Sequence, residues 1–335
     1  MRLKLEDIGR MAGVSRSTVS RVINDEPNVS PEVRARVEDV IRRTGFTPHA
    51  AARSLVSRRS GILGLVIPMR VHDLFEDPYF ARLIRDVTVA GNTAGTTLSL
   101  FLFQTEEEER EIYPRVVESG FVDGVLVTAT RIGDPLLTRM RASSMPIVMI
   151  GRPDTDGVSY VDVDNRGGAR RVAEHLVDLG RQRIAMIAAP ANTTTGADRH
   201  LGFIDGLTER GVVADPGLRV VGDYSEASGY EGMKSLLPER PDAVFAASDA
   251  MAIGAMRAIR EAGLDIPDDI AVAGFDGFTA SESTDPPLTT VRQPVDTTAQ
   301  YAVRLLNRLI DGEIHEPTAE VVPVEFLPRR STAAT

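Results

Sequence analysis

Four polar side chains near the N-terminus have the chemistry to read DNA bases. Arg16, Ser17, Ser20 and Arg21 share the outer side of a predicted helix over residues 16–24. The guanidinium fork of arginine matches the O6 and N7 acceptors of guanine, and serine or threonine hydroxyls suit phosphates and mixed base edges. A helix in the major groove reads bases from its N-terminal residues, where Arg16 and Ser17 lie.

The helix before these residues is predicted over residues 5–12. Its apolar residues Ile8, Met11 and Ala12 recur at helical spacing on one face, which we expect to be buried. Gly13 then allows the chain to reverse direction. Two short helices joined by a tight turn with a glycine form a helix-turn-helix.

The remaining positions complete a three-helix unit. Ser15 is suited to cap the reading helix, whose Val19 and Val22 or Ile23 turn inward. A third helix is predicted from Ser30-Pro31 to about Thr44, because a capping serine followed by proline begins many helices. The spacing alone leaves one alternative open, a small three-helix bundle with a solvated basic face.

The charges of the chain are divided unevenly between its two parts. Residues 1–60 hold 12 Lys and Arg against 7 Asp and Glu, a net of +5, while the whole chain carries −10. A basic head on an acidic body confines contact with phosphates to one end, although chance sampling of a solvated surface is the alternative.

Composition excludes several further classes. With 0 cysteines the chain has neither disulfides nor thiolate metal sites. It contains no run of 18 apolar residues, and its start, MRLKLEDIGRMAGVS, differs from a secretory signal. We therefore expect a cytoplasmic protein without a membrane span.

Residues 61–330 alternate between apolar runs and helical patterns. Near-continuous apolar strands indicate a parallel sheet covered on both faces, and the alternation with helices indicates doubly wound α/β units. The series is long enough for two lobes that meet near residues 160–164, with a single large sheet as the alternative. The predicted strands are 62–68, 97–103, 124–128, 147–150, 184–188, 243–247 and 270–275, and the clearest helices are 79–93, 167–179 and 250–262.

The motifs of the head are specific. The runs LEDIGRMAGVSRSTVSRVIND and VSPEVRARVEDVIRRTGFTPHAAARSL resemble the head of the lactose/galactose-repressor (LacI/GalR) family over about 55 contiguous residues. The resemblance implies that Arg16, Ser17 and Arg21 read bases. It also implies that a second set contacts phosphates, namely Ser15, Thr18, Asn24 and Ser30.

The segment PHAAARSLV over residues 48–56 resembles the hinge of that family. The resemblance implies a short helix on operator DNA in which Leu55, with Ala52 beside it, enters the minor groove as an apolar wedge. His49 stands where the family usually has asparagine, which puts the first hinge contact in doubt. Packing of Leu55 on the body is the alternative.

The body also resembles this family, whose ligand-binding part has the two-lobed fold of periplasmic sugar-binding proteins. The matching motifs include GILGLVIP, IGRP, VDVDNRGGARRVAEHLVDLG and AGFD. The implied division is a DNA-binding head at 1–47, a hinge and linker at 48–60, and a ligand-binding and dimerisation body at 61–330. Within the body, lobe 1 is expected over about 61–160 and 291–320, and lobe 2 over about 161–290 and 321–330.

Effector residues follow from the same resemblance. Arg199 and Asp276 align with an arginine and an acid that clamp the ligand across a cleft, a pair suited to vicinal hydroxyls. Phe80 and Tyr224 align with aromatic walls of the pocket. Ser248 and Gln293 complete the predicted effector set, whereas Asp249 is interpreted as structural. For each polar residue, a satisfied structural hydrogen bond is the alternative.

The predicted effector is a sugar or sugar derivative. Thr193 stands where purine-binding members of the family carry an arginine, which disfavours a purine. Whether the ligand releases or strengthens DNA binding stays open, with release by an inducer favoured by the resemblance.

Other functions fit less well. The five histidines lack metal-ligand spacing and no nucleophile-elbow, P-loop or dinucleotide motif occurs, so we expect neither an enzyme nor a cofactor. A transport solute-binding protein fits the body but not the basic head. The chain is therefore predicted to be a homodimeric, sequence-specific repressor on palindromic operator DNA, because one helix-turn-helix reads only a half-site.

Overall fold

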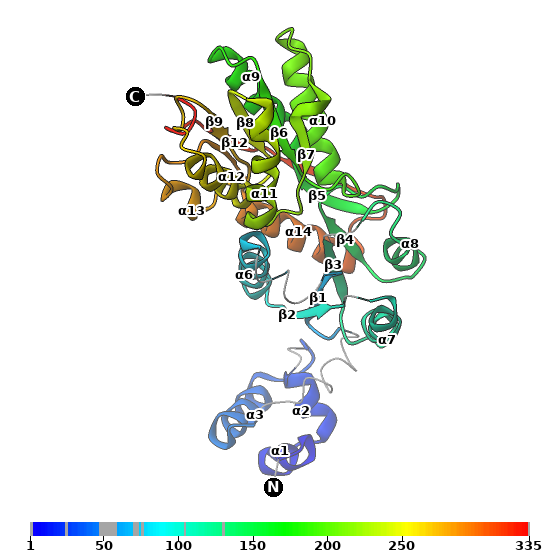
Figure 1. Ribbon diagram of the computed structural model, residues 1–335. Coiled ribbons are helices and arrows are strands. Elements are labelled where there is room, and N and C mark those ends of the chain that lie inside the picture. Colours follow the sequence, from blue (N-terminus) through cyan, green and yellow to red (C-terminus); the bar gives the residue numbers. More distant parts are fainter. Residues whose placement is uncertain are drawn as a thin grey trace.

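The computed structural model describes residues 3–23, 26–46, 59–69, 74, 77–103, 105–128 and 131–333. Figure 1 shows a helical head at the N-terminal end and two α/β lobes stacked beyond it. The predicted fold class, a helix-turn-helix head on a two-lobed parallel-sheet body, is confirmed.

The head consists of three helices, α1 (Leu5–Ala12), α2 (Arg16–Ile23) and α3 (Pro31–Thr44). Ile8, Val19 and Val37 contribute one fully buried side chain from each helix to its core. Gly13 makes the turn after α1 with a φ of 68°, in the left-handed region that favours glycine. This glycine turn joins α1 and α2 as the sequence predicts.

One apolar residue of α1 does not join the core. Met11 is 56% exposed, whereas Ile8 and Ala12 are buried, so its predicted burial is wrong. The helical spacing places Met11 at the edge of the apolar face, and in so short a head α2 and α3 cover only the centre of that face.

Lobe 1 is built on a six-stranded parallel sheet in the order β11-β5-β4-β3-β1-β2. Leu65 faces one buried cluster and Val66 the other, so both faces of the sheet are covered. Helices α6 and α14 pack together on one face. The strands are β1 (Ile62–Ile67), β2 (Thr97–Leu102), β3 (Gly124–Thr128), β4 (Ile147–Ile150), β5 (Ser159–Val163) and β11 (Ala319–Val322), and the helices are α6 (Pro78–Thr93), α7 (Glu106–Val117), α8 (Pro135–Arg141) and α14 (Val295–Ile310).

Strand β2 departs from the expectation of a strand buried on both faces. It lies at the edge of the sheet and has no fully buried residue, and Leu100 is 37% exposed. An apolar run therefore indicated a strand here but not its position in the sheet. The sequence pattern did not predict β5, because acidic and aromatic residues interrupt its apolar run.

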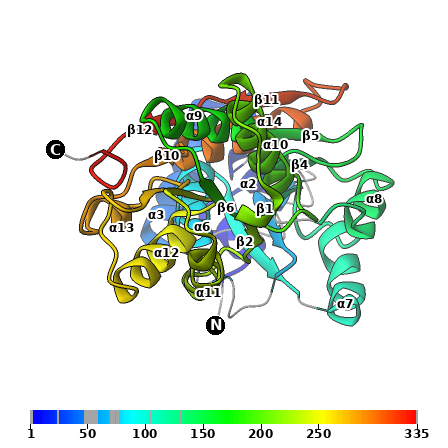
Figure 2. The same cartoon turned by 45° about the horizontal axis from the view of Figure 1, so that its top comes forward.

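Lobe 2 is built on a four-stranded parallel sheet in the order β7-β6-β8-β9. Helices α9 and α10 form one packed pair and α11 and α12 another (Figures 1 and 2). A Cβ added at Gly202 of α10 would lie 2.0 Å from the carbonyl oxygen of Arg166, so this pair needs glycine for its close approach. The elements are β6 (Ile184–Ala188), β7 (Arg219–Val221), β8 (Ala243–Ala246), β9 (Ala271–Ala273), α9 (Asn165–Asp178), α10 (Thr194–Glu209), α11 (Glu226–Leu236), α12 (Asp249–Glu261), α13 (Thr279–Glu282) and the 3-10 turns η1 (Pro216–Leu218) and η2 (Leu237–Glu239).

A small antiparallel ribbon lies beside the second sheet. It pairs β10 (Thr290–Arg292) with β12 (Glu325–Leu327). The chain leaves β5 for α9, returns from β10 into α14, and leaves again from β11 into β12. These three passages between the lobes bring the carboxyl ends of β5, β6 and β9 and the N-terminus of α6 towards one another.

Candidate functional site

The predicted base-reading side chains project from the head into solvent. The side chains of Arg16 and Arg21 are 67% and 53% exposed. Arg16 lies 3.3 Å from a carboxylate oxygen of Glu6, and Arg21 lies 3.8 Å from one of Glu26. Ion pairs this exposed contribute about 0–1 kcal/mol, so DNA can replace these carboxylates at little cost. Neither acidic partner, Glu6 or Glu26, was predicted from the sequence.

Two of the predicted phosphate contacts also hold helix ends. Ser15 Oγ accepts a hydrogen bond from the Thr18 amide at 3.2 Å and lies 2.8 Å from Ser17 Oγ. Ser30 Oγ accepts from the Val33 amide at 3.4 Å and so caps α3. Serine at these positions satisfies backbone donors that also attract anions. Thr18, another predicted phosphate contact, has its Oγ1 2.9 Å from Ser15 Oγ. The predicted DNA contacts Asn24, Ala52 and Leu55 lie outside the described residues.

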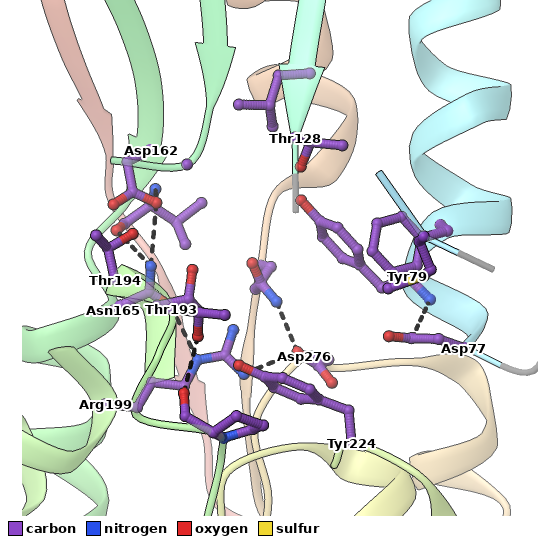
Figure 3. A pocket seen from close by; sticks show the side chains of 18 of the residues that line it. Asp77, Tyr79, Thr128, Asp162, Asn165, Thr193, Thr194, Arg199, Tyr224 and Asp276 are labelled. Carbon is purple, nitrogen blue, oxygen red and sulfur yellow. Dashed lines mark hydrogen bonds and ion pairs between the residues drawn. The ribbon is translucent and has the colours of Figure 1, made fainter. Parts of the chain in front are cut away.

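A cavity of about 1010 Å³ lies between the two lobes (Figure 3). Five of the six predicted effector residues line it: Phe80, Arg199, Tyr224, Asp276 and Gln293. The sixth, Ser248, is not among the lining residues. Its hydroxyl caps α12 by accepting a hydrogen bond from the Met251 amide at 3.2 Å.

Arg199 of α10 is held by a buried network. Its Nε donates to Asn165 Oδ1 at 2.9 Å, and its Nη1 donates to the Ala247 carbonyl at 2.5 Å. Nη1 also lies 3.4 Å from Asp276 Oδ1, and the guanidinium covers the Phe275 ring at 3.8 Å from its centroid. With only 2% of its surface exposed, Arg199 is set in one orientation before any ligand arrives.

Asp276 is the acid that forms an ion pair with Arg199. It accepts a hydrogen bond of 2.6 Å from Gln293 Nε2. Burial raises the pKa of Asp276 well above its ordinary value, and Arg199 offsets only part of that rise. Beneath it, Asp249 accepts hydrogen bonds from the Thr290 hydroxyl and the Phe278 amide, contacts that fit its interpretation as structural.

Backbone strain marks two of these residues. Tyr224 has a φ of 73° and Asp276 a φ of 125°, where L-residues are rarely found. Such conformations cost on the order of 1–3 kcal/mol each and persist where the surroundings impose them, often at ligand sites. Here the strained backbone aims an aromatic ring and a carboxylate into the cavity (Figure 3).

Several lining residues were not predicted from the sequence. Asp77 caps α6 and accepts from the Tyr79 amide at 2.9 Å. The Tyr79 and Phe80 rings meet edge to face at 5.3 Å between centroids. On the lobe-1 wall, the additional lining residues include Thr128 and Asp162. Asp77 and Tyr79 lie in the run DPYF (residues 77–80), and Asp162 lies in VDVDN (residues 161–165). Each of these runs leads into the start of a helix at the cavity edge, whereas Thr128 is the last residue of β3.

Two further properties of the described residues bear on function. Among them no group of three His, Cys, Asp or Glu side chains is arranged to hold a metal ion. No helix in the same part of the chain is both long and apolar enough to cross a membrane.

The head and cavity together define a class: a DNA-binding head joined to a two-lobed ligand-binding body. Comparison with known families agrees, since residues 4–49 match the bacterial regulatory proteins of the lacI family and residues 173–332 match a periplasmic binding protein-like domain. The chain is 37% identical over 332 residues to the HTH-type transcriptional regulator CelR of Thermobifida fusca, covering 98% of this chain and 97% of that protein.

Solved structures agree over the same span. A structure of the transcriptional regulator CelR with cellobiose matches at a TM-score of 0.78 and 36% identity, covering 98% of this chain and 100% of that one. The lac repressor dimer bound to operator and the anti-inducer ONPF matches at a TM-score of 0.88 and 27% identity, covering 100% of both chains. This chain belongs to the lacI family of bacterial transcription regulators. It is a DNA-binding regulator with an effector-binding body, and the proteins it resembles are regulators, not enzymes.

Proposed function

We propose that this chain is a homodimeric repressor whose affinity for a palindromic operator is set by a carbohydrate bound between the lobes. The observation that carries the proposal is the convergence of Arg199, Asp276, Gln293, Phe80 and Tyr224 on one cavity. A guanidinium and a carboxylate side by side suit a vicinal diol, and aromatic rings suit the apolar face of a sugar ring.

The size of the cavity supports an effector larger than one sugar ring. Its volume of about 1010 Å³ is at the upper end for small-molecule sites. The structure of the transcriptional regulator CelR that is 36% identical to this chain is a complex with the disaccharide cellobiose. We therefore infer a disaccharide or a short oligosaccharide.

The proposed division of labour follows the predicted boundaries, with residues 1–47 as the head, 48–60 as the hinge and linker, and 61–330 as the body. Arg16, Ser17 and Arg21 would read bases, with Ser15, Thr18 and Ser30 on phosphates. Dimerisation is supported by lobe 1, where Val89 of α6 and Leu100 of the edge strand β2 are 59% and 37% exposed. Exposed apolar residues beside an open sheet edge are typical of an interface.

The test is a linked titration. Operator affinity is measured with and without cellobiose and a panel of other neutral oligosaccharides, and the affinity for each active sugar is measured with and without operator. Coupling of about 1–3 kcal/mol would change DNA affinity roughly 5- to 150-fold, and the two factors must be equal. Relief of operator binding by a sugar is expected. A full-length chain that binds a half-site as tightly as a palindrome, or that ignores every sugar, would contradict the proposal.

A further inference from the structure

The lobe-1 wall of the cavity carries an acid that forms no ion pair with any residue that the structure describes. Asp162, near the end of β5, is 8% exposed and lines the cavity (Figure 3). Its Oδ1 accepts hydrogen bonds from the Val163 amide at 2.8 Å and from Asn165 Nδ2 at 3.1 Å. None of the residues that the structure describes is recorded as donating to Oδ2, so this oxygen is left for a ligand.

The two arginines whose charges act on Asp162, Arg152 and Arg199, are already engaged with other acids. Arg152 forms a two-pronged ion pair with Asp198, with nitrogen–oxygen distances of 2.7 and 3.1 Å. Arg199 is held by Asp276, Asn165 and Ala247. Burial therefore raises the pKa of Asp162 more than the charges of the two arginines lower it, to a value of about 6. With this pKa the carboxyl group is mostly ionised at neutral pH.

Other walls of the cavity carry acids too. Asp77 lines it from the start of α6, and Asp276 lines it from lobe 2. The remaining lining arginine, Arg131, is exposed, so water and salt screen its charge. Inside an enclosed site, like charges repel more strongly than in water. An anionic ligand would therefore be repelled by the carboxylate of Asp162, whereas a neutral polyol would donate a hydrogen bond to it. Asp276 is already paired with Arg199 and adds little to this repulsion.

We propose that Asp162 is a specificity residue that accepts a hydroxyl hydrogen bond from the effector and excludes anionic ligands. The effector class is then an uncharged carbohydrate, without phosphate or carboxylate groups. This inference rests on the proposed function, because it presumes a carbohydrate in the cavity. It adds a lobe-1 contact to the clamp of Arg199 and Asp276 in lobe 2, so that one ligand joins both lobes.

Asp162→Asn removes the charge with little change of shape. The asparagine carbonyl oxygen keeps the acceptor for Val163 and Asn165, while an amide replaces the free carboxylate oxygen. Asp156→Asn is the matched control, since Asp156 is an exposed acid six positions before Asp162 in the sequence and does not line the cavity. Asp162→Glu retains the charge and serves as the conservative variant.

The measurement is binding by calorimetry to the full-length protein with two pairs of probes. These are cellobiose with cellobiose 6′-phosphate, and glucose with glucose 6-phosphate. The wild type and the Asp156→Asn variant should prefer each neutral sugar by tenfold or more. Asp162→Asn should reduce that preference about tenfold, whereas Asp162→Glu should preserve it. Melting curves verify that each variant is folded.

Two results separate the failures. If the neutral sugars bind but Asp162→Asn leaves the ratio of neutral to anionic affinity unchanged, Asp162 is not the determinant and this inference is overturned. If the wild type binds the phosphorylated sugars more tightly than the neutral ones, the inference that the cavity excludes anionic ligands is wrong. If neither form of any sugar binds while operator binding is intact, the carbohydrate proposal itself falls.

Discussion

The proposed base-reading residues of α2 (Arg16, Ser17 and Arg21) and the cavity between the lobes both include arginine, yet the two environments of the arginine side chain are opposite. Arg16 is 67% exposed and has a carboxylate of Glu6 at 3.3 Å. Arg199 is 2% exposed and is fixed by Asn165, Ala247 and Asp276. The first arginine can change partners freely, whereas the second is ordered before the ligand arrives.

This difference fits the two tasks. A DNA-reading side chain must exchange one phosphate or base for another as the protein searches, and a weak exposed ion pair permits that. A residue that holds a ligand binds it more tightly when folding has already fixed its side chain, because no entropy is then lost in ordering that side chain on binding. The three predictions below test the contrast, from the largest effect to the smallest.

Replacing Arg199 with alanine should have the largest effect. Removing one partner of a buried ion pair typically destabilises a protein by about 3–5 kcal/mol, but proton uptake by Asp276 should keep the loss near the lower end. The same change should remove the sugar response entirely while leaving operator binding without sugar intact. Thermal melting and operator titration with and without sugar measure both. A variant that responds fully to the sugar would show that the clamp is elsewhere.

The buried carboxylates should impose a pH dependence on the body. The pKa of Asp162 is about 6 in the folded chain against 3.8 ordinarily, so the folded state binds the extra proton. Stability from this group is therefore present below about pH 4 and falls as pH rises towards 6, by at most about 3 kcal/mol.

Asp162→Asn should remove this component, so the difference in melting temperature between variant and wild type should grow from pH 4 to pH 6. Asp156→Asn, at an exposed acid, should track the wild type across the range. A constant difference for Asp162→Asn would show that this carboxyl does not titrate as its burial implies.

Replacing Arg16 with alanine should leave stability nearly unchanged, because its ion pair with Glu6 is exposed to solvent. It should instead relax base preference at one position of each half-site, by about 1–3 kcal/mol. Arg36→Ala, at an exposed residue of α3, is the comparison. It should weaken binding evenly across sequences and flatten the salt dependence.

Selection of binding sites from random DNA separates these two variants. If the Arg16 variant selects the same bases as the wild type, Arg16 contacts only the backbone and does not belong to the reading set.

The sequence by itself determined the local elements and the family. Helical spacing and capping residues located α1, α2 and α3, and apolar runs located β3, β4 and β6 to the residue, because these signals act between neighbours in the chain. Contiguous motifs also predicted Arg199 and Asp276 as effector residues, and both line the cavity. Local patterns did not show which neighbours a residue would have in the folded chain or how deeply it would be buried. They placed Met11 in the core, gave no sign that β2 is an edge strand, and did not separate the helix cap Ser248 from residues that line the cavity.

Only the tertiary structure decided which charges share the cavity. Asp77, Asp162, Arg199 and Asp276 lie on four separate segments and meet because parallel strands of two sheets present their carboxyl ends to one cleft. Whether an acid there is neutralised depends on where its nearest arginines point. Arg152 and Arg199 turn to Asp198 and Asp276, which leaves Asp162 facing the ligand space. Spacing along the chain does not show which acid each arginine pairs with, because these ion pairs arise from packing between segments far apart in the sequence.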